Sequence, residues 1–193
     1  MPPIARDSLL PLEAYARERK EFRARAIERR RRRTVALGEH VTLQFEDELT
    51  VRYQIQEMLR IERIFEEEGI RGELDAYNPL VPDGTNWKAT MLLEYPDVEE
   101  RRRRLAELRG IERKVWVQVE NCEPVTAIAD EDLERENDEK TASVHFLRFE
   151  LPPGMQSRVK DGAGISIGID HPAYLAKVEL PTETREALAQ DLA

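Results

Sequence analysis

The sequence is poor in cysteine and has no long apolar run. A single thiol, Cys122, is present among 193 residues; it cannot form an intrachain disulfide and excludes zinc or iron–sulfur sites built from cysteines. No stretch of about 18 uncharged apolar residues occurs, so no segment is predicted to span a bilayer. The first residues also lack the apolar core of a signal peptide. These absences favour a cytoplasmic protein.

Catalytic signatures are missing as well. The chain contains no phosphate-binding loop, dinucleotide fingerprint or nucleophile elbow. Whether the protein is an enzyme therefore stays open at this point. The leading hypothesis is a non-catalytic accessory or binding protein, with a metal-dependent enzyme as the alternative and a nucleic-acid-binding protein as the third.

Charge is abundant and unevenly distributed. The net charge is −9, yet residues 1–33 hold eleven Lys and Arg against five Asp and Glu. The balance of this end is thus +6, which leaves −15 for the remainder. A predominantly acidic protein is a poor general binder of nucleic acid, because attraction to phosphate grows with positive potential.

The stretch Thr50–Glu68 predicts an amphipathic helix around which the chain is organised. Its apolar residues, including Val51, Ile55 and Phe65, recur on one side at about 100° per residue, and Gly69 is a plausible C-cap. Polar residues on the opposite side indicate that both faces are partly covered. We expect a central helix.

Glu62 lies on the predicted apolar stripe of this helix. An isolated buried carboxylate is costly, so it is expected to be protonated or paired. It is therefore a candidate general base or metal ligand, and structural pairing with an arginine or backbone amides is the competing interpretation. On the other side, Tyr53, Glu57 and Arg60 are candidate ligand-binding residues, although Glu57 and Arg60 also suit a simple intrahelical pair.

The remaining pattern predicts an α+β fold with a mainly antiparallel sheet. A basic helical arm over residues 1–33 precedes an α+β domain over residues 34–193, and the arm is expected to belong to the same structural unit. Alternating apolar residues predict a hairpin over Thr34–Glu46, and Gly69–Trp87 is expected to be an ordered loop. Further strands are expected at 88–95, 114–120, 125–129, 141–151, 165–170 and 176–180.

The histidines suggest a metal site. Each of the three sits in or beside a predicted strand, and imidazoles with a carboxylate are common ligands of zinc and non-haem iron. No His-x-His spacing brings them together in the sequence, so packing each singly is the competing interpretation. The candidate ligands are His40, His145, His171 and Asp170, with Glu46 or Glu62 as further carboxylates.

The run Arg29–Arg33 allows three interpretations. It could contact nucleic acid, it could be a solvated helix end whose cations favour the carboxyl-terminal dipole, or it could dock against the acidic stretch Asp130–Glu139. The second interpretation is favoured over the first.

Several short strings resemble a bacterial family known only as a domain of unknown function. They are Tyr-Gln-Ile-Gln-Glu-Met-Leu-Arg at 53–60, Phe-Glu at 45–46, Glu-Leu-Asp-Ala-Tyr-Asn at 73–78 and Gly-Ile-Asp-His-Pro-Ala-Tyr at 168–174. Genes of that family lie beside those for rubrerythrin and an iron–sulfur oxidoreductase. The resemblance implies a role in redox or peroxide-stress metabolism and such an enzyme as partner, and it favours a bound metal, iron or zinc, without identifying its ligands. The oligomeric state, including a homo-oligomer, is left open.

Overall fold

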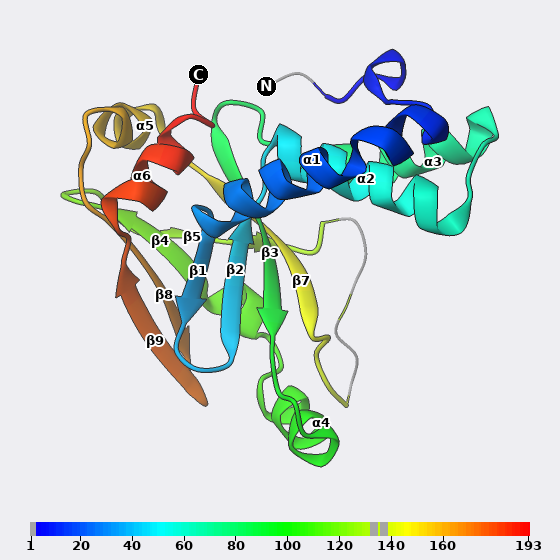
Figure 1. Cartoon of the computed structure of the whole chain (residues 1–193). Helices are drawn as coiled ribbons and strands as arrows, with labels where there is room; N and C mark the ends of the chain where they lie inside the picture. Colours follow the sequence, from blue (N-terminus) through cyan, green and yellow to red (C-terminus); the bar gives the residue numbers. More distant parts are fainter. Residues whose placement is uncertain (1–2, 132–134, 136–138) are drawn as a thin grey trace.

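The computed structural model describes residues 3–131, 135 and 139–193. Over these residues the chain forms six α-helices, three short 3-10 helices and two antiparallel sheets, so the predicted α+β fold is confirmed (Figure 1). The 3-10 helices are η1 (Arg6–Ser8), η2 (Asn78–Leu80) and η3 (Ile111–Lys114). None of the described helices is long and apolar enough to cross a membrane.

The first sheet has five strands in the order β1-β2-β3-β7-β6, with all neighbours antiparallel. The predicted hairpin is present, and Gly38 at its turn has φ 72°, a value that glycine adopts at little cost. Successive side chains alternate between the two faces, as strand geometry requires. The strands are β1 (Thr34–Leu37), β2 (Val41–Phe45), β3 (Asn86–Leu93), β6 (Ile128–Ala129) and β7 (Val144–Glu150).

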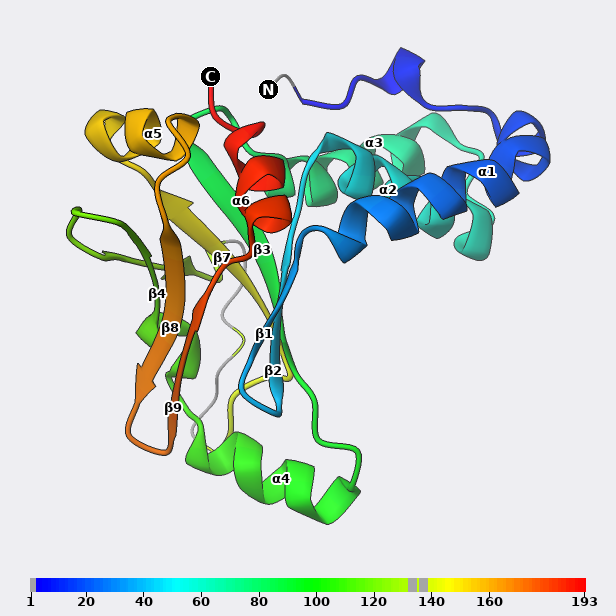
Figure 2. The ribbon, with the colours of Figure 1, turned by 60° about the vertical axis from the view of Figure 1, so that its left-hand side comes forward.

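The second sheet has four strands in the order β5-β4-β8-β9. Its inner face packs against the inner face of the first sheet, and the largest apolar cluster draws on strands of both (Figure 2). The single sheet expected from the sequence is therefore two sheets around one core. The strands are β4 (Val115–Val119), β5 (Val125–Thr126), β8 (Ile165–His171) and β9 (Tyr174–Glu179).

Three helices form a layer at one end of the first sheet, where α2 packs between α1 and α3 (Figure 1). Buried apolar residues at helical spacing, Val51, Ile55 and Leu59, join α2 to α3 in a cluster separate from the sandwich core. The central position predicted for this helix is correct. The layer consists of α1 (Leu12–Arg31), α2 (Glu48–Glu62) and α3 (Glu67–Tyr77).

The other three helices lie away from this layer. α4 (Val98–Glu107) covers the opposite end of the sandwich, whereas α5 (Pro153–Lys160) and α6 (Thr182–Ala189) lie side by side near the carboxyl terminus (Figures 1 and 2). The indole N–H of Trp87 donates to the carbonyl of Leu188 over 3.0 Å. This bond attaches the carboxyl-terminal segment to the sandwich core.

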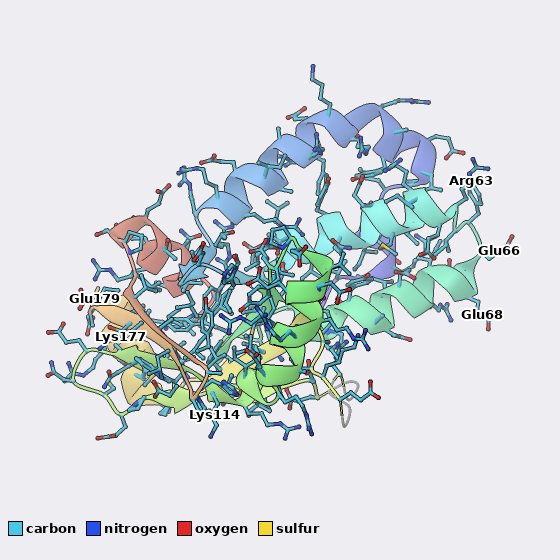
Figure 3. All side chains as sticks on the ribbon, turned by 90° about the horizontal axis from the view of Figure 1, so that it is seen from below. Arg63, Glu66, Glu68, Lys114, Lys177 and Glu179 are labelled. Carbon is cyan, nitrogen blue, oxygen red and sulfur yellow. The ribbon has the colours of Figure 1, made fainter. Side chains whose placement is uncertain are left out.

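The central helix is shorter than predicted. It ends at Glu62, because Arg63 adopts the left-handed conformation with φ 55° and its N–H bonds to the carbonyl of Leu59. Phe65, expected on the buried stripe, is consequently 64% exposed, and Ile61 is 60% exposed. Figure 3 shows Arg63 at the outer end of the α2–α3 hairpin.

The predicted loop Gly69–Trp87 begins instead as a helix. Gly69 lies inside α3, and Ile70 and Leu74, four residues apart, are buried in the same cluster as the apolar face of α2. Packing against α2 therefore outweighs the low helix propensity of glycine.

Candidate functional site

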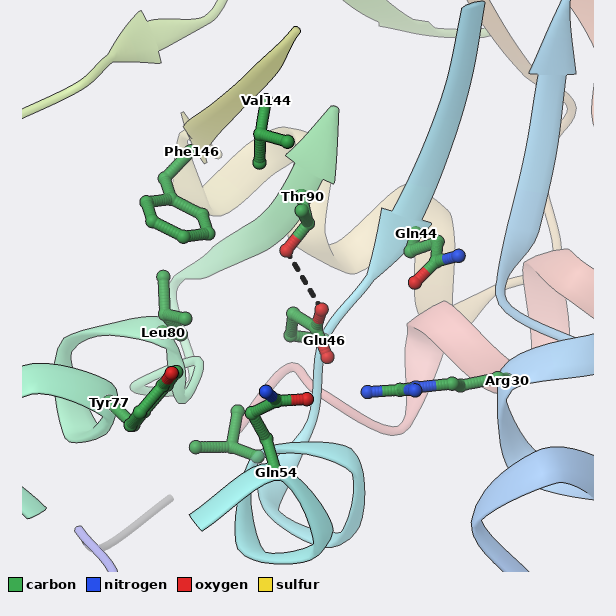
Figure 4. Close-up of a pocket in the computed structure, with 10 residues that line it drawn as sticks. Arg30, Gln44, Glu46, Gln54, Tyr77, Leu80, Thr90, Val144 and Phe146 are labelled. Atoms are coloured by element: carbon green, nitrogen blue, oxygen red, sulfur yellow. Dashed lines mark hydrogen bonds between the residues drawn. The ribbon is translucent and has the colours of Figure 1, made fainter. Parts of the chain in front are cut away.

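A cavity of about 260 Å³ lies between α2, the end of α1 and the outer face of the first sheet (Figure 4). This volume is near the lower end of the roughly 300–1,000 Å³ typical of ligand pockets. The cavity combines charged, amide, hydroxyl and apolar groups. Its lining residues are Arg30, Gln44, Glu46, Val51, Gln54, Tyr77, Leu80, Thr90, Val144 and Phe146.

Strand alternation explains how polar residues reach this cavity. In β2, Leu43 and Phe45 point into the sandwich core, so Gln44 and Glu46, the residue just after the strand, point to the outer face. Thr90 of β3 is the register partner of Gln44 and faces the same way. The floor of the cavity is therefore polar, although the sheet beneath it is built on an apolar core.

Glu46 is the most deeply buried acid of the cavity, with 6% of its surface exposed. The hydroxyl of Thr90 donates to its Oε1 over 2.9 Å, and the hydroxyl of Thr50 donates to its Oε2 over 2.6 Å. Its backbone N–H donates to the carbonyl of Lys88, and its own carbonyl accepts from the guanidinium of Arg33. The two hydroxyls orient the carboxylate, and the two backbone bonds fix the main chain that carries it.

Arg30 approaches the cavity from the last turn of α1. Figure 4 shows its guanidinium pointing toward Glu46 and Gln54. The guanidinium lies 5.7 Å from the ring centroid of Tyr53, a cation–π contact. Its buried Nε has no hydrogen-bond partner within the described residues, and a buried unpaired donor costs about 1–3 kcal/mol.

The two charged groups of the cavity do not neutralise each other. Within the described part of the chain, no ion pair joins Arg30 to Glu46. The aliphatic and aromatic side chains of Leu80 and Phe146 form the wall on the other side (Figure 4). The cavity can therefore offer a ligand a donor fork, an acceptor pair and an apolar surface together.

The candidate residues on the other face of α2 form a bridge between helices. Glu57 accepts two bonds from Arg19 over 2.8 and 2.9 Å, one from the hydroxyl of Tyr15 over 2.7 Å, and two from Arg60 over 3.1 and 3.3 Å. The hydrogen bonds from Arg19 lower the pKa of Glu57 to about 2. The intrahelical Glu57–Arg60 pair is thus present, and α1 contributes further partners that its sequence did not reveal.

Tyr53 does not take part in the hydrogen bonds described for that bridge. Its ring stacks on Phe22 of α1 at 6.1 Å between centroids and lies under Arg30. Of the three residues predicted to bind a ligand together, Tyr53 is the one that reaches the cavity's arginine. It does so by supporting Arg30.

Glu62 does not occupy the buried position expected for it. The side chain is exposed, since it is the last residue of α2, where the chain turns away at Arg63. The proximity of Glu62 contributes to raising the pKa of Glu73, although burial of Glu73 is the larger cause. Because Glu62 is exposed, burial no longer provides a reason to consider it a general base.

The three histidines have separate partners. His40 stacks on Tyr95 at 4.2 Å between centroids, and its Nδ1 is 3.1 Å from the carbonyl oxygen of Glu94. The Nε2 of His171 is 3.1 Å from the carbonyl oxygen of Arg109.

His145 is fully buried, and its ring nitrogens lie 2.6 Å from a carboxylate oxygen of Asp130 and 2.9 Å from the hydroxyl of Thr141. Asp170, the proposed carboxylate ligand, lies on the exposed side of β8 beside Trp116. Among residues 3–131, 135 and 139–193, no three His, Cys, Asp or Glu side chains are grouped to hold a metal ion. The metal site stays a prediction from sequence.

The arginine run joins α1 to its neighbours, although Arg31 and Arg32 stay exposed. Arg29 bonds to Asp47, the N-cap of α2, and Arg31 and Arg32 both contact Glu183 of α6. Arg33 is completely buried. The favoured interpretation, a solvated helix end, is wrong for Arg29 and Arg33, because acids distant in the sequence surround them.

The third interpretation is that the arginine run docks on the acidic stretch Asp130–Glu139. Asp130 and Glu131 of that stretch contact other residues. Asp130 bonds to His145 and Arg135, and Glu131 bonds to Arg148. Residues 132–134 and 136–138 lie outside the described residues.

Sequence reasoning named Glu46 only as an auxiliary metal ligand and did not separate Arg30 from its neighbours. One signal was available for Glu46, because a carboxylate ending an alternating strand must lie on one of its two faces. No local signal distinguishes Arg30 from Arg29 or Arg31.

The fold defines an α+β protein with a polar-floored cavity between a helical layer and a two-sheet core. Residues 3–192 match the family described as "Protein of unknown function (DUF3501)", and the chain belongs to this family. Membership of a family of unknown function, inferred from short strings, is thereby confirmed. Its genomic redox context stays a prediction.

The chain is also similar to a protein solved by crystallography, described as a "novel protein of unknown function" from Burkholderia pseudomallei K96243. The two are 53% identical, the match covers 100% of each chain, and the TM-score is 0.95. Comparison with curated proteins found no match.

Proposed function

We propose that this protein is a binding protein whose ligand is a small polar molecule held in the cavity between α2 and the first sheet. One observation carries the proposal: the guanidinium of Arg30 points into the cavity, and no described residue forms a hydrogen bond or ion pair with its terminal nitrogens. A guanidinium has five donors and cannot lose its charge. A ligand with an anionic acceptor could bond to the terminal nitrogens of Arg30 through charge-assisted hydrogen bonds.

The surroundings of Arg30 support binding over packing as the reason for this arrangement. Glu46 is held by two hydroxyl donors, and Gln44 and Gln54 add amides to the same cavity. Convergent polar groups on an apolar wall are the usual composition of a ligand pocket. No histidine, cysteine or lysine is among the described residues that line the cavity, so the proposal is recognition without chemistry.

The proposals drawn from the family resemblance remain separate from the cavity. Iron or zinc bound through His40, His145, His171 and Asp170 is tested by elemental analysis of protein purified without a histidine tag. An association with rubrerythrin or an iron–sulfur oxidoreductase is tested by mixing the purified proteins in analytical ultracentrifugation. Neither result would alter the argument from Arg30.

A cavity-filling variant tests the proposed function. Thermal unfolding is measured with amino acids, small carboxylates, amines, glucose and inorganic phosphate, because a compound that binds only the folded state raises Tm. We expect at least one class to stabilise the wild type and to lose this effect in Gln54→Trp, where an indole occupies the cavity.

Ala106→Trp, on the exposed side of α4, is the matched control and should respond as the wild type does. If a compound still raises the Tm of Gln54→Trp, it binds outside this cavity. No stabilisation by any of these classes would overturn the proposal.

A further inference from the structure

We infer that the ligand is a zwitterion of the α-amino acid class, with its carboxylate on Arg30, its amine on Glu46 and an apolar side chain against Leu80 and Phe146. The inference rests on the proposed function and specifies the chemistry of the same cavity. Arg30 and Glu46 are opposite charges that face one cavity without forming an ion pair with each other in the described structure. A molecule carrying both charges at one end would complement both.

The requirement for an anionic group comes from Arg30. Planar guanidinium groups bind carboxylates through two parallel N–H···O bonds, which are stronger than neutral hydrogen bonds. Arg29 and Arg33, its neighbours, are each bonded to an aspartate, whereas Arg30 has only the ring of Tyr53 beneath it. Of these three arginines, Arg30 is thus the one whose terminal N–H groups are available to a ligand in the cavity.

The requirement for a cationic donor comes from Glu46. A carboxylate has about four lone-pair sites, and the hydroxyls of Thr50 and Thr90 occupy two of them. The Thr50 hydroxyl itself accepts from the N–H of Asp47, and its shorter donor contact is with Glu46, at 2.6 Å against 3.1 Å to the carbonyl of Asp47. Glu46 therefore presents acceptors only, and a ligand ammonium can satisfy them.

Glu46 also argues against a phosphate as the anion on Arg30. A phosphate monoester carries about −1.5 to −2 charges at neutral pH. Placing it in a small cavity beside a buried carboxylate would be repulsive, because Coulomb energies rise as the surroundings become less polar. A carboxylate with an attached ammonium adds no net charge.

The requirement for an apolar ligand side chain comes from the wall formed by Leu80 and Phe146. Figure 4 shows Leu80 and Phe146 gathered away from Arg30, on the far side of Glu46. A smaller hollow of about 70 Å³ shares Leu80 and Phe146 with the cavity and continues along the sheet toward Lys88. The wall thus accepts a branched aliphatic chain next to the charged end.

Calorimetric titration with three molecules of one shape tests the inference. L-leucine carries both charges, 4-methylpentanoate lacks the amine and 3-methylbutylamine lacks the carboxylate. We expect L-leucine to bind at least roughly tenfold more tightly than either, because each lost charged hydrogen bond is worth about 1.5–3 kcal/mol.

Two variants assign the charges. Arg30→Gln should weaken L-leucine at least roughly tenfold and leave 3-methylbutylamine unchanged, since only the carboxylate contact is lost. Glu46→Gln should weaken L-leucine and leave 4-methylpentanoate unchanged or tighter. Arg23→Gln and Glu39→Gln, which alter exposed charges of the same signs, are the controls and should bind as the wild type does.

The outcomes separate this inference from the proposed function. If 4-methylpentanoate, 3-methylbutylamine or inorganic phosphate binds as tightly as L-leucine and Gln54→Trp abolishes that binding, the cavity is a binding site and the zwitterion assignment is wrong. If L-leucine binds equally well to Arg30→Gln and Glu46→Gln, the assignment is also wrong. If none of the amino acids, carboxylates, amines, glucose and phosphate binds in the cavity, both are overturned.

Discussion

Arg30 and Arg33 are three residues apart, yet their surroundings are opposite. Arg33 is completely buried and donates to the carbonyls of Phe45, Glu46 and Ala187 as well as to Asp191. Arg30 is half-buried, has a buried Nε without a partner and faces a cavity. The first arginine is saturated by the fold, and the second is not.

The difference separates a charge that holds the chain together from one that is open to the proposed ligand. Arg33 joins the end of α1 to β2 and to the segment after α6, so its charge is balanced within the protein. Burial raises the pKa of Asp191 to about 6, although the charge of Arg33 opposes this effect. Removing either partner would leave the other buried and unbalanced.

The largest effect is expected from breaking the saturated pair. Arg33→Met should lower the free energy of unfolding by about 3–5 kcal/mol, because it leaves a buried carboxyl and three carbonyls without their donor. Urea denaturation followed by the fluorescence of the fully buried Trp87 measures the change. Arg32→Met, on a half-exposed neighbour, should change it by less than about 0.5 kcal/mol. Equal effects would show that Arg33 is no more structural than Arg32.

The second expected effect concerns coupling within that pair. Asp191→Leu combined with Arg33→Met removes both charges, so the double variant should be more stable than the sum of the single changes predicts. A coupling energy of about 0.5–3 kcal/mol is expected for groups in direct contact. The measurement is a double-mutant cycle in urea. Strict additivity would mean that the carbonyl contacts of Arg33, and not its ion pair, account for its role.

Glu57 is an intermediate case, saturated but closer to solvent, and its effect should depend on pH. Its folded pKa is about 2, lowered by the bonds from Arg19, against an ordinary value of 4.5. Its stabilising contribution is therefore complete above about pH 4.5 and is lost as pH falls toward about 2. Glu57→Gln should cost about 1–2 kcal/mol at pH 7, and the deficit should shrink through that acidic range.

Urea denaturation of both proteins between pH 2 and pH 7 provides the test of this dependence. Glu39→Gln, whose side chain is 88% exposed, should track the wild type throughout. A deficit that stays constant down to pH 2 would mean that Glu57 acts through packing and not through its charge.

Much of the fold follows from periodicity in the sequence. The hairpin of β1 and β2, the alternating strands and the central position of α2 are all consequences of apolar spacing. The extent of α2 was wrong because Arg63, which has no special turn propensity, adopts the left-handed conformation. The helix α3 was missed because burial of Ile70 and Leu74 outweighs two glycines, and such burial depends on partners elsewhere in the chain.

The site was harder to predict because its charges are distinguished only by their tertiary partners. The run Arg29–Arg33 reads as five equivalent cations, yet Arg29 meets Asp47, Arg33 meets Asp191 and Arg30 meets a cavity. Those acids are 18 and 158 residues away in sequence. No local pattern encodes such pairings. The sequence therefore indicated residues at helical spacing, such as Glu57 and Arg60, as candidates and did not distinguish Arg30.

The smallest expected effect on stability is the most informative for the comparison. Arg30→Gln should change the free energy of unfolding, without ligand, by less than about 0.5 kcal/mol, because losing the contact with Tyr53 is offset by removing a buried unpaired donor. The same variant should lose the stabilisation that L-leucine gives the wild type. Paired urea titrations with and without L-leucine measure both quantities. A loss as large as that of Arg33→Met would show that Arg30 is needed for folding, and the distinction between the two arginines would fail.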